Sequence, residues 1–251
     1  MAAAALLGAG ATAVAAPGAS GDRCPPSPGG VTASITPTQA LLCNSRITRE
    51  WSIGADGSVV TTALRGHDDA ARAGSGADFV LDIDGVRTSS TTGWVLASVT
   101  SPELPALPNR PRSGHGAALL FHYALVSAAA PVGVALDRLV ILHPGAAVLE
   151  TRSTLVNSAP APVRVSAYSL DQVTPPDGSL SLPAEVHAYN DGSDWRDDYR
   201  HVSSPTGSFD VEGEVARFGG DAGFFLVSQR RGGAMSRVGR DADGRTWVGE
   251  E

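Results

Sequence analysis

The sequence contains no lysine, and charged residues of all kinds make up only 18% of its 251 residues. All 19 basic side chains are therefore arginine, and the formal net charge is -7. Such a surface repels phosphate backbones, and nucleic-acid binding needs a basic stripe that the arginine doublet Arg230–Arg231 is too short to form. Nucleic acid is excluded as a partner.

Helical patterning is also missing. Beyond the N-terminal run, no window holds an apolar stripe at i, i+3, i+4 and i+7 with caps, and 29 glycines and 17 prolines are spread along the chain. The sequence therefore predicts few helices. No later segment is apolar for the roughly 20 residues that a membrane-spanning helix needs.

The first 16 residues, MAAAALLGAGATAVAA, are small and apolar. Their length and the closing Ala-Val-Ala-Ala are typical of an export signal, and the Gly and Pro residues that interrupt the run argue against a membrane anchor. The basic start of a signal is missing, so a misplaced start codon or a low-complexity tail remain alternatives. We expect residues 1–23 to be signal peptide and linker, followed by one β-sandwich domain over residues 24–251, in a secreted, extracellular protein.

Only two cysteines are present, Cys24 and Cys43. In an oxidising compartment they can form a disulfide that closes a loop of about 20 residues and stabilises the fold by roughly 3 kcal/mol in the chain-entropy model. Two unpaired thiols are the alternative.

The remaining pattern is that of β-strands. Residues 46–53 alternate polar and apolar side chains, Asp56–Gly57 marks a turn, and residues 58–64 continue the alternation, which predicts a hairpin. Residues 78–83 followed by Asp84–Gly85 predict a second hairpin. Further strands are expected at residues 119–125, 132–142, 148–156 and 163–170. Short strands at this spacing predict an all-β fold, a large antiparallel two-sheet β-sandwich with few helices.

Motifs of several enzyme classes are missing. The six histidines show no HExxH or HxH spacing, no G-x-S-x-G elbow occurs, and no glycine-rich segment is followed by a helix. The sequence therefore predicts no cofactor and no zinc.

The densest group of polar and aromatic residues spans 187–201. Aromatic faces stack on the C–H face of a sugar, and carboxylates, amides and guanidinium groups bind its hydroxyls. The candidate substrate-binding residues are Trp195, Arg196, Asp197, Asp198, Tyr199 and Arg200.

Several other interpretations of this group remain open. Its aromatics could pack on the sandwich while neighbouring Asp and Arg residues pair locally, or it could form a protein interface. Oxygens from its Asn and Asp side chains could bind calcium, although their spacing matches no EF-hand loop. Asp197 and Asp198 are adjacent on the chain and so point to opposite faces of a strand, which argues against a catalytic carboxylate pair.

Four segments resemble the N-terminal region of α-galactosidase-like glycoside hydrolases of family 36 and its relatives. They are Leu42–Trp51, Asp56–Gly57 with Thr61–Leu64, Val148–Asn157 and Asp194–Arg200. The resemblance covers residues 40–235 and implies a β-supersandwich of the galactose-mutarotase-like type, placed before a (β/α)8 catalytic barrel. The family's serine, glycine and histidine motif is not found after Arg200.

The resemblance implies that both catalytic aspartates lie beyond Glu251, so we expect the chain by itself to be inactive. It implies a saccharide as ligand, and a downstream catalytic domain or a second copy of the chain as protein partner. A stand-alone extracellular carbohydrate-binding or adhesive sandwich is the alternative function, and a purely structural surface protein is a third.

Overall fold

The computed structural model describes residues 24, 30–66, 71–73, 76–104, 116–127, 133–169, 172–173, 184–189, 199–203, 212–218, 223–226, 236–240 and 246–250. For residues 71–73 and those beyond 165, the description covers the backbone. All regular structure in these ranges is β-strand, with no helix, and every paired strand is antiparallel to its neighbour. This confirms the all-β class.

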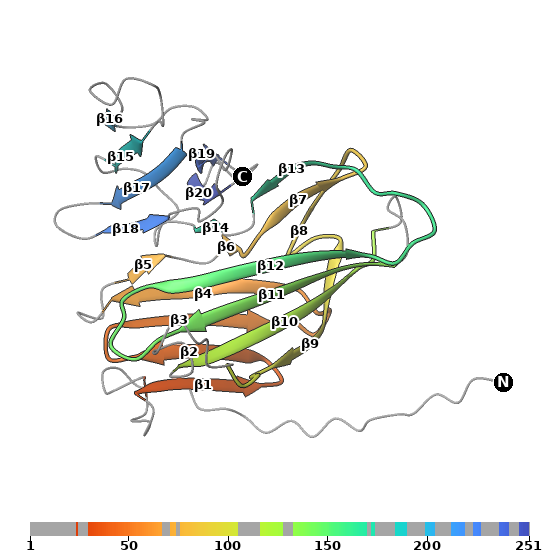
Figure 1. Cartoon of the computed structure of the whole chain (residues 1–251), viewed down its shortest axis with the longest axis horizontal. Helices are drawn as coiled ribbons and strands as arrows, with labels where there is room; N and C mark the ends of the chain where they lie inside the picture. Colours follow the sequence, from red (N-terminus) through yellow and green to blue (C-terminus); the bar gives the residue numbers. More distant parts are fainter. Residues whose placement is uncertain are drawn as a thin grey trace.

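The first sheet is built by the N-terminal part of the chain (Figure 1). It contains, in spatial order, β1 (Val31–Thr36), β2 (Gln39–Asn44), β3 (Ile47–Ile53), β4 (Val59–Gly66) and β5 (Ala71–Ala73), and β6 (Gly76–Ala77) also pairs with β4. We call this the β1–β5 sheet. Its first strand begins at Val31.

A second sheet lies over the first. It has the order β12 (Leu149–Asn157), β11 (Val134–Leu142), β10 (Ala117–Leu125) and β9 (Trp94–Thr100), and we call it the β9–β12 sheet. Strand β10 contacts β1 and β2, and the rings of Trp51 and Phe121 lie 5.1 Å apart across the interface. The two sheets therefore form the expected sandwich (Figure 1).

Three smaller sheets complete the described structure. One has the order β13 (Val165–Ser169), β7 (Val80–Ile83) and β8 (Val86–Ser89). Another has the order β14 (Gln172–Val173), β20 (Thr246–Glu250) and β19 (Ser236–Arg240). The last has the order β16 (Tyr199–Ser203), β15 (Ala184–Tyr189), β17 (Glu212–Phe218) and β18 (Gly223–Leu226).

Both predicted hairpins are confirmed. Ile53 pairs with Val59 across the Asp56–Gly57 loop, and Ile83 pairs with Val86 across Asp84–Gly85. In the second turn Asp84 and Gly85 have φ angles of 49° and 81°. Positive φ at both central residues is the signature of a type I′ turn, which matches the twist of the flanking strands.

Alternation along the strands places the core between the two large sheets. In β10 the residues Leu119, Phe121 and Tyr123 are fully buried, and the residues between them point to the other face of the sheet. These side chains meet Trp51, Phe79 and Trp94 in one aromatic cluster. The core is therefore shared by both sheets and by the start of the β7–β8 hairpin.

Candidate functional site

The saccharide-binding residues predicted from sequence lie in the connection between β15 and β16 and at the start of β16. Trp195, Arg196, Asp197 and Asp198 lie outside the described residues. Tyr199 and Arg200 open β16, where the backbone register places Tyr199 opposite Tyr189 of the neighbouring strand. The candidate loop 190–198 therefore joins two paired antiparallel strands, and its binding role stays a prediction.

Among the residues whose side chains are described, a group of buried polar residues lies inside the sandwich. Arg49 occupies the same face of β3 as Ile47 and Trp51, and Arg138 occupies the same face of β11 as Leu136. The exposed fractions of the two arginine side chains are 3% and 0%. In the sequence, each arginine is a charged residue at a position where the alternation of its strand calls for an apolar one, and this signal was missed.

Asp78 joins the two arginines. Its Oδ1 accepts a hydrogen bond from Arg49 Nη2 at 2.6 Å, and its Oδ2 accepts one from Arg138 Nη1 at 2.6 Å. Oδ1 also accepts from the Trp51 ring N–H at 3.1 Å and from the Thr61 hydroxyl at 3.0 Å. One carboxylate thus ties β3 and β4 of one sheet to β11 of the other.

The backbone of Asp78 also forms hydrogen bonds on both sides of its Cα. Its N–H donates to Ser90 Oγ at 2.8 Å, and its carbonyl accepts from Arg138 Nη1 at 2.9 Å. Ser90 in turn donates to the Val59 carbonyl at 2.7 Å. The sequence predicts a strand from residue 78, whereas β7 begins at Val80, because Asp78 is turned into the core by these contacts.

Electrostatics keep this carboxylate charged. Burial acts to raise the pKa of Asp78, but the guanidinium groups of Arg138 and Arg49 oppose it, together with the hydrogen bonds from Trp51 and Thr61. The resulting pKa of Asp78 lies below its ordinary value. An ion pair in a low-dielectric interior survives when it is hydrogen-bonded in this way.

Aromatic rings enclose the cluster. The guanidinium carbon of Arg49 lies 5.1 Å from the centroid of the Trp51 ring, and that of Arg138 lies 5.3 Å from the Phe79 ring. Both distances fall in the range of cation–π interactions. Because all the side chains of this cluster are buried, solvent and ligands do not reach it, and its role is to link the two sheets.

A second polar group lies on the outer face of the β9–β12 sheet, where it is open to solvent. The register aligns Ser98, His122, Asp137 and Thr154 in one row across β9 to β12. His122 Nδ1 and Asp137 Oδ1 form a hydrogen bond, and their side chains are 43% and 37% exposed. The sequence gives no metal-binding spacing around this histidine, and its partner Asp137 lies 15 positions away.

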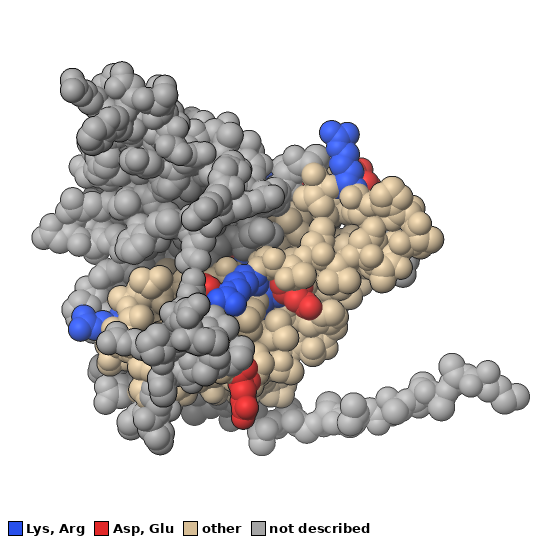
Figure 2. All heavy atoms as spheres, in the orientation of Figure 1, with Lys and Arg blue, Asp and Glu red and all other residues tan. Residues whose placement is uncertain are grey.

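The face shown in Figure 2 carries only small groups of charged side chains over the β9–β12 sheet, and most of its described surface is uncharged. The exposed His122 imidazole and Asp137 carboxylate can form hydrogen bonds with hydroxyl groups. In the part of the chain whose side chains are described, no three His, Cys, Asp or Glu residues are grouped so that they could hold a metal. Nor does any described segment form a helix long and apolar enough to cross a membrane.

Comparison with known proteins gives a match in structure and none in sequence. No family model matches the sequence, and no curated protein does. Among solved structures, the galactosidase domain of the α-galactosidase–sucrose kinase AgaSK matches with a TM-score of 0.61 over 87% of this chain, at 8% identity. The GH36 α-galactosidase AgaB from Geobacillus stearothermophilus matches with a TM-score of 0.58 over 87%, at 10% identity.

The α-galactosidase from Lactobacillus brevis matches with a TM-score of 0.57 over 84% of this chain, at 8% identity. The chain shares its fold with part of these α-galactosidases. It spans 38%, 37% and 36% of the lengths of the three matched chains. It is thus a β domain related in fold to those of glycoside hydrolases, and the sequence-based resemblance agrees with this fold.

Proposed function

We propose that this chain is the non-catalytic, N-terminal β-sandwich of a secreted α-galactosidase-like glycoside hydrolase, where it contributes to saccharide binding and supports a catalytic barrel. The observation that carries the proposal is the asymmetry of the structural matches. At least 84% of this chain aligns with each α-galactosidase, but no more than 38% of any of them is matched. The reacting carboxylates of such an enzyme would then be supplied by the remainder.

The chemistry of the loop between β15 and β16 supports a saccharide ligand. Trp195 offers an apolar face for the sugar ring, and the side chains of residues 196–198 offer a guanidinium and two carboxylates for its hydroxyls. Because β15 and β16 are neighbouring antiparallel strands, this loop starts and finishes at the same end of the strand pair. A short connection on a paired scaffold is a common setting for binding residues.

Titration calorimetry of the purified chain with galactose tests the binding part of the proposal, with a β-linked glucose disaccharide as the control ligand. We expect galactose to bind and the control disaccharide not to bind. Trp195→Ala should lower the affinity for galactose about fivefold, because one stacked ring contributes roughly 1 kcal/mol. Trp195→Phe keeps an aromatic face and should retain most of the affinity.

Activity is tested with 4-nitrophenyl α-galactoside, and we expect no turnover by the purified chain. Turnover above that of a heat-inactivated sample would contradict the non-catalytic role. Equal affinity for all sugars tested, or affinity unchanged in Trp195→Ala, would contradict saccharide binding by this loop. Tight binding of a glycan other than an α-galactoside would instead favour the stand-alone carbohydrate-binding protein.

A further inference from the structure

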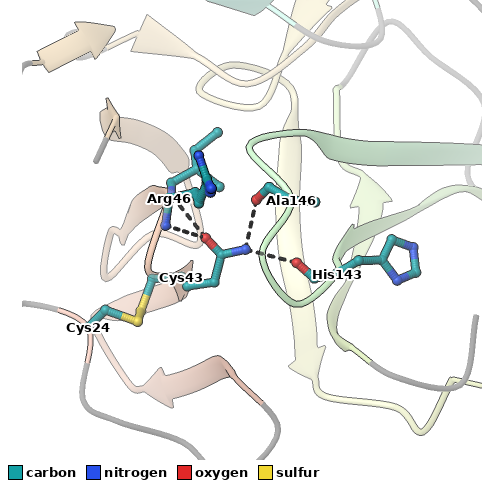
Figure 3. Close-up of a disulfide and its surroundings, with 7 residues drawn as sticks. Cys24, Cys43, Arg46, His143 and Ala146 are labelled. Atoms are coloured by element: carbon teal, nitrogen blue, oxygen red, sulfur yellow. Dashed lines mark hydrogen bonds between the residues drawn. A yellow bond between two sulfur atoms is a disulfide. The ribbon is translucent and has the colours of Figure 1, made fainter. Parts of the chain in front are cut away.

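One corner of the sandwich is closed by three segments that are distant in the sequence. They are the segment before β1 with Cys24 and Gly30, the end of β2 with Cys43 and Asn44, and the β11–β12 loop at residues 143–146 (Figure 3). A disulfide joins Cys24 to Cys43, with 5.7 Å between the Cα atoms. The two cysteines that the sequence left as either paired or free are thus bonded here.

The two sulfur atoms have unequal surroundings. Cys43 is the fifth residue of β2, and Leu42 before it points into the core, so Cys43 points to the outer face of the sheet. Its side chain is nevertheless fully buried, whereas Cys24 is only partly buried. Of the two residues, Cys24 is the more exposed.

Asn44, next to Cys43, connects this disulfide to the second sheet. Its Nδ2 donates to the carbonyls of His143 and Ala146, both at 2.8 Å, and its Oδ1 accepts from the N–H groups of Arg46 at 2.7 Å and Ile47 at 3.0 Å. Figure 3 shows that these bonds join one side chain both to the segment at Arg46 and to the loop at His143 and Ala146. A displacement of residue 43 therefore moves the amide that holds the β11–β12 loop.

The segment before β1 touches the same loop. A Cβ added at Gly30 would lie 3.5 Å from Pro144 Cβ, so Gly30 lies beside the Pro144 side chain. Val31, Leu42 and Leu142 lie directly beneath the corner and belong to the buried core. Loosening the corner would open this end of the core to water.

We propose that the Cys24–Cys43 disulfide is a redox-controlled lock on this corner, and that small thiols open it by attack on the Cys24 sulfur. The attacking thiolate forms a new S–S bond with Cys24 Sγ, and the Cys24–Cys43 bond breaks. Cys43 Sγ leaves with the electron pair and takes a proton from water. A second thiol then releases Cys24 and carries away the first thiol as a small-molecule disulfide, so that two thiols are oxidised for one protein disulfide reduced.

The buried position of Cys43 favours re-formation of the disulfide after attack on Cys24. While the mixed disulfide persists, the Cys43 sulfur stays next to it. Once deprotonated, it can attack Cys24 Sγ, expel the small thiol and re-form the original bond. Opening frees the segment before β1 from the end of β2 and weakens the restraint on Asn44. The proposal needs no saccharide and stands apart from the function proposed above.

The site of attack is tested by incubating the folded full chain with glutathione, quenching with acid and mapping the adducts by mass spectrometry. We expect the mixed disulfide on Cys24 to exceed that on Cys43 by at least tenfold. Comparable amounts on both residues would overturn the proposal, as would reduction no faster than global unfolding measured under the same conditions.

Opening of the corner is tested by hydrogen exchange on the oxidised and reduced forms of the same protein. The amides of Arg46, Ile47 and Ala146 should exchange faster after reduction, while those in the middle of β10 and β11 should keep their rates. The double variant Cys24→Ser/Cys43→Ser controls for direct effects of glutathione and should show none. Unchanged exchange at the corner, or an equal increase over all strands, would contradict a local lock.

Discussion

Asp78 links the two facing sheets through buried hydrogen bonds and ion pairs. Replacing it by Asn preserves its shape but leaves the guanidinium groups of Arg49 and Arg138 without the carboxylate that neutralises them in the core. Removing one partner of a buried ion pair costs roughly 3–5 kcal/mol. We expect Asp78→Asn to lower the free energy of unfolding by this amount in urea denaturation.

Asp56→Asn provides the matched control for Asp78→Asn. Asp56 accepts hydrogen bonds from the N–H and hydroxyl of Ser58 in an exposed loop, and these bonds lower the pKa of Asp56. Because an amide oxygen can still accept there and the site is solvated, this variant should unfold close to the wild-type midpoint. If both substitutions cost the same, the cluster around Asp78 does not contribute to stability as its geometry indicates.

Single residues also show which contacts cannot be predicted from the sequence. Alternation predicts which face of β3 is buried, but Arg49 on that face gives no indication of its partners. Its contacts come from Asp78, 29 positions away, and that carboxylate also binds Arg138, 60 positions further along the chain. Pairings over such separations are fixed by how the sheets stack, and the local pattern carries no information about stacking.

At the scale of elements, the two Asp-Gly turns make a controlled comparison. Gly57 and Gly85 have φ angles of 79° and 81°, so an added Cβ strains both backbones alike. At Gly85 the Cβ meets nothing within 4 Å, whereas at Gly57 it lies 2.5 Å from Val95 Cγ1 and 3.2 Å from the Leu96 nitrogen. We expect Gly85→Ala to cost about 1–2 kcal/mol and Gly57→Ala to cost roughly 1–3 kcal/mol more.

Chemical denaturation of the two alanine variants measures this difference directly. The Gly57 carbonyl accepts a hydrogen bond from the Leu96 N–H at 2.8 Å, so the clash also pushes the hairpin away from β9. Equal costs for the two variants would mean that the hairpin and β9 separate without penalty. In that case the contact does not hold these elements together.

The strands could be predicted to a large extent, and their order in space could not. The predicted strands at 46–53, 119–125 and 148–156 overlap β3, β10 and β12, because β-branched and alternating residues between turn signals report local structure. The sheet order β12-β11-β10-β9 and the insertion of the β7–β8 hairpin beside β13 depend on long-range pairing. The candidate saccharide loop rests on composition alone, since its central residues lie outside the described ranges.

At the scale of the whole molecule, the fold is shared with proteins of very different sequence. Identity of 8–10% accompanies TM-scores of 0.57–0.61. Sandwiches tolerate such divergence because any set of apolar residues with the right alternation and volume fills the space between two sheets. Shared fold therefore supports a shared architecture, whereas function has to be argued from the side chains of the site.

The free energy of unfolding of the whole molecule should decrease both at acid pH, because of Asp78, and at alkaline pH, because of Tyr123. The pKa of Asp78 is lowered by folding, so its contribution is complete above the unfolded value of about 3.9 and is lost as the pH falls through the folded value. Burial, with the nearby Asp78 charge, raises the pKa of Tyr123 well above 10.0. The unfolded tyrosine releases its proton from about pH 10, so stability declines above that pH.

Tyr123→Phe isolates the alkaline part of this profile. The Tyr123 hydroxyl is buried and has no hydrogen-bond partner among the described groups, so its removal leaves the packing of the ring against Phe79 and Phe121 in place. Relieving an unsatisfied buried hydroxyl should leave the protein at pH 7 as stable as wild type or more stable by about 1 kcal/mol. The gap in unfolding free energy should then widen above pH 10, because only the wild type still holds a buried phenol that its unfolded state would ionise. Urea titrations at pH 7 and pH 11 measure both quantities, and a variant less stable than wild type at pH 7 would mean that the hydroxyl has a partner in solution.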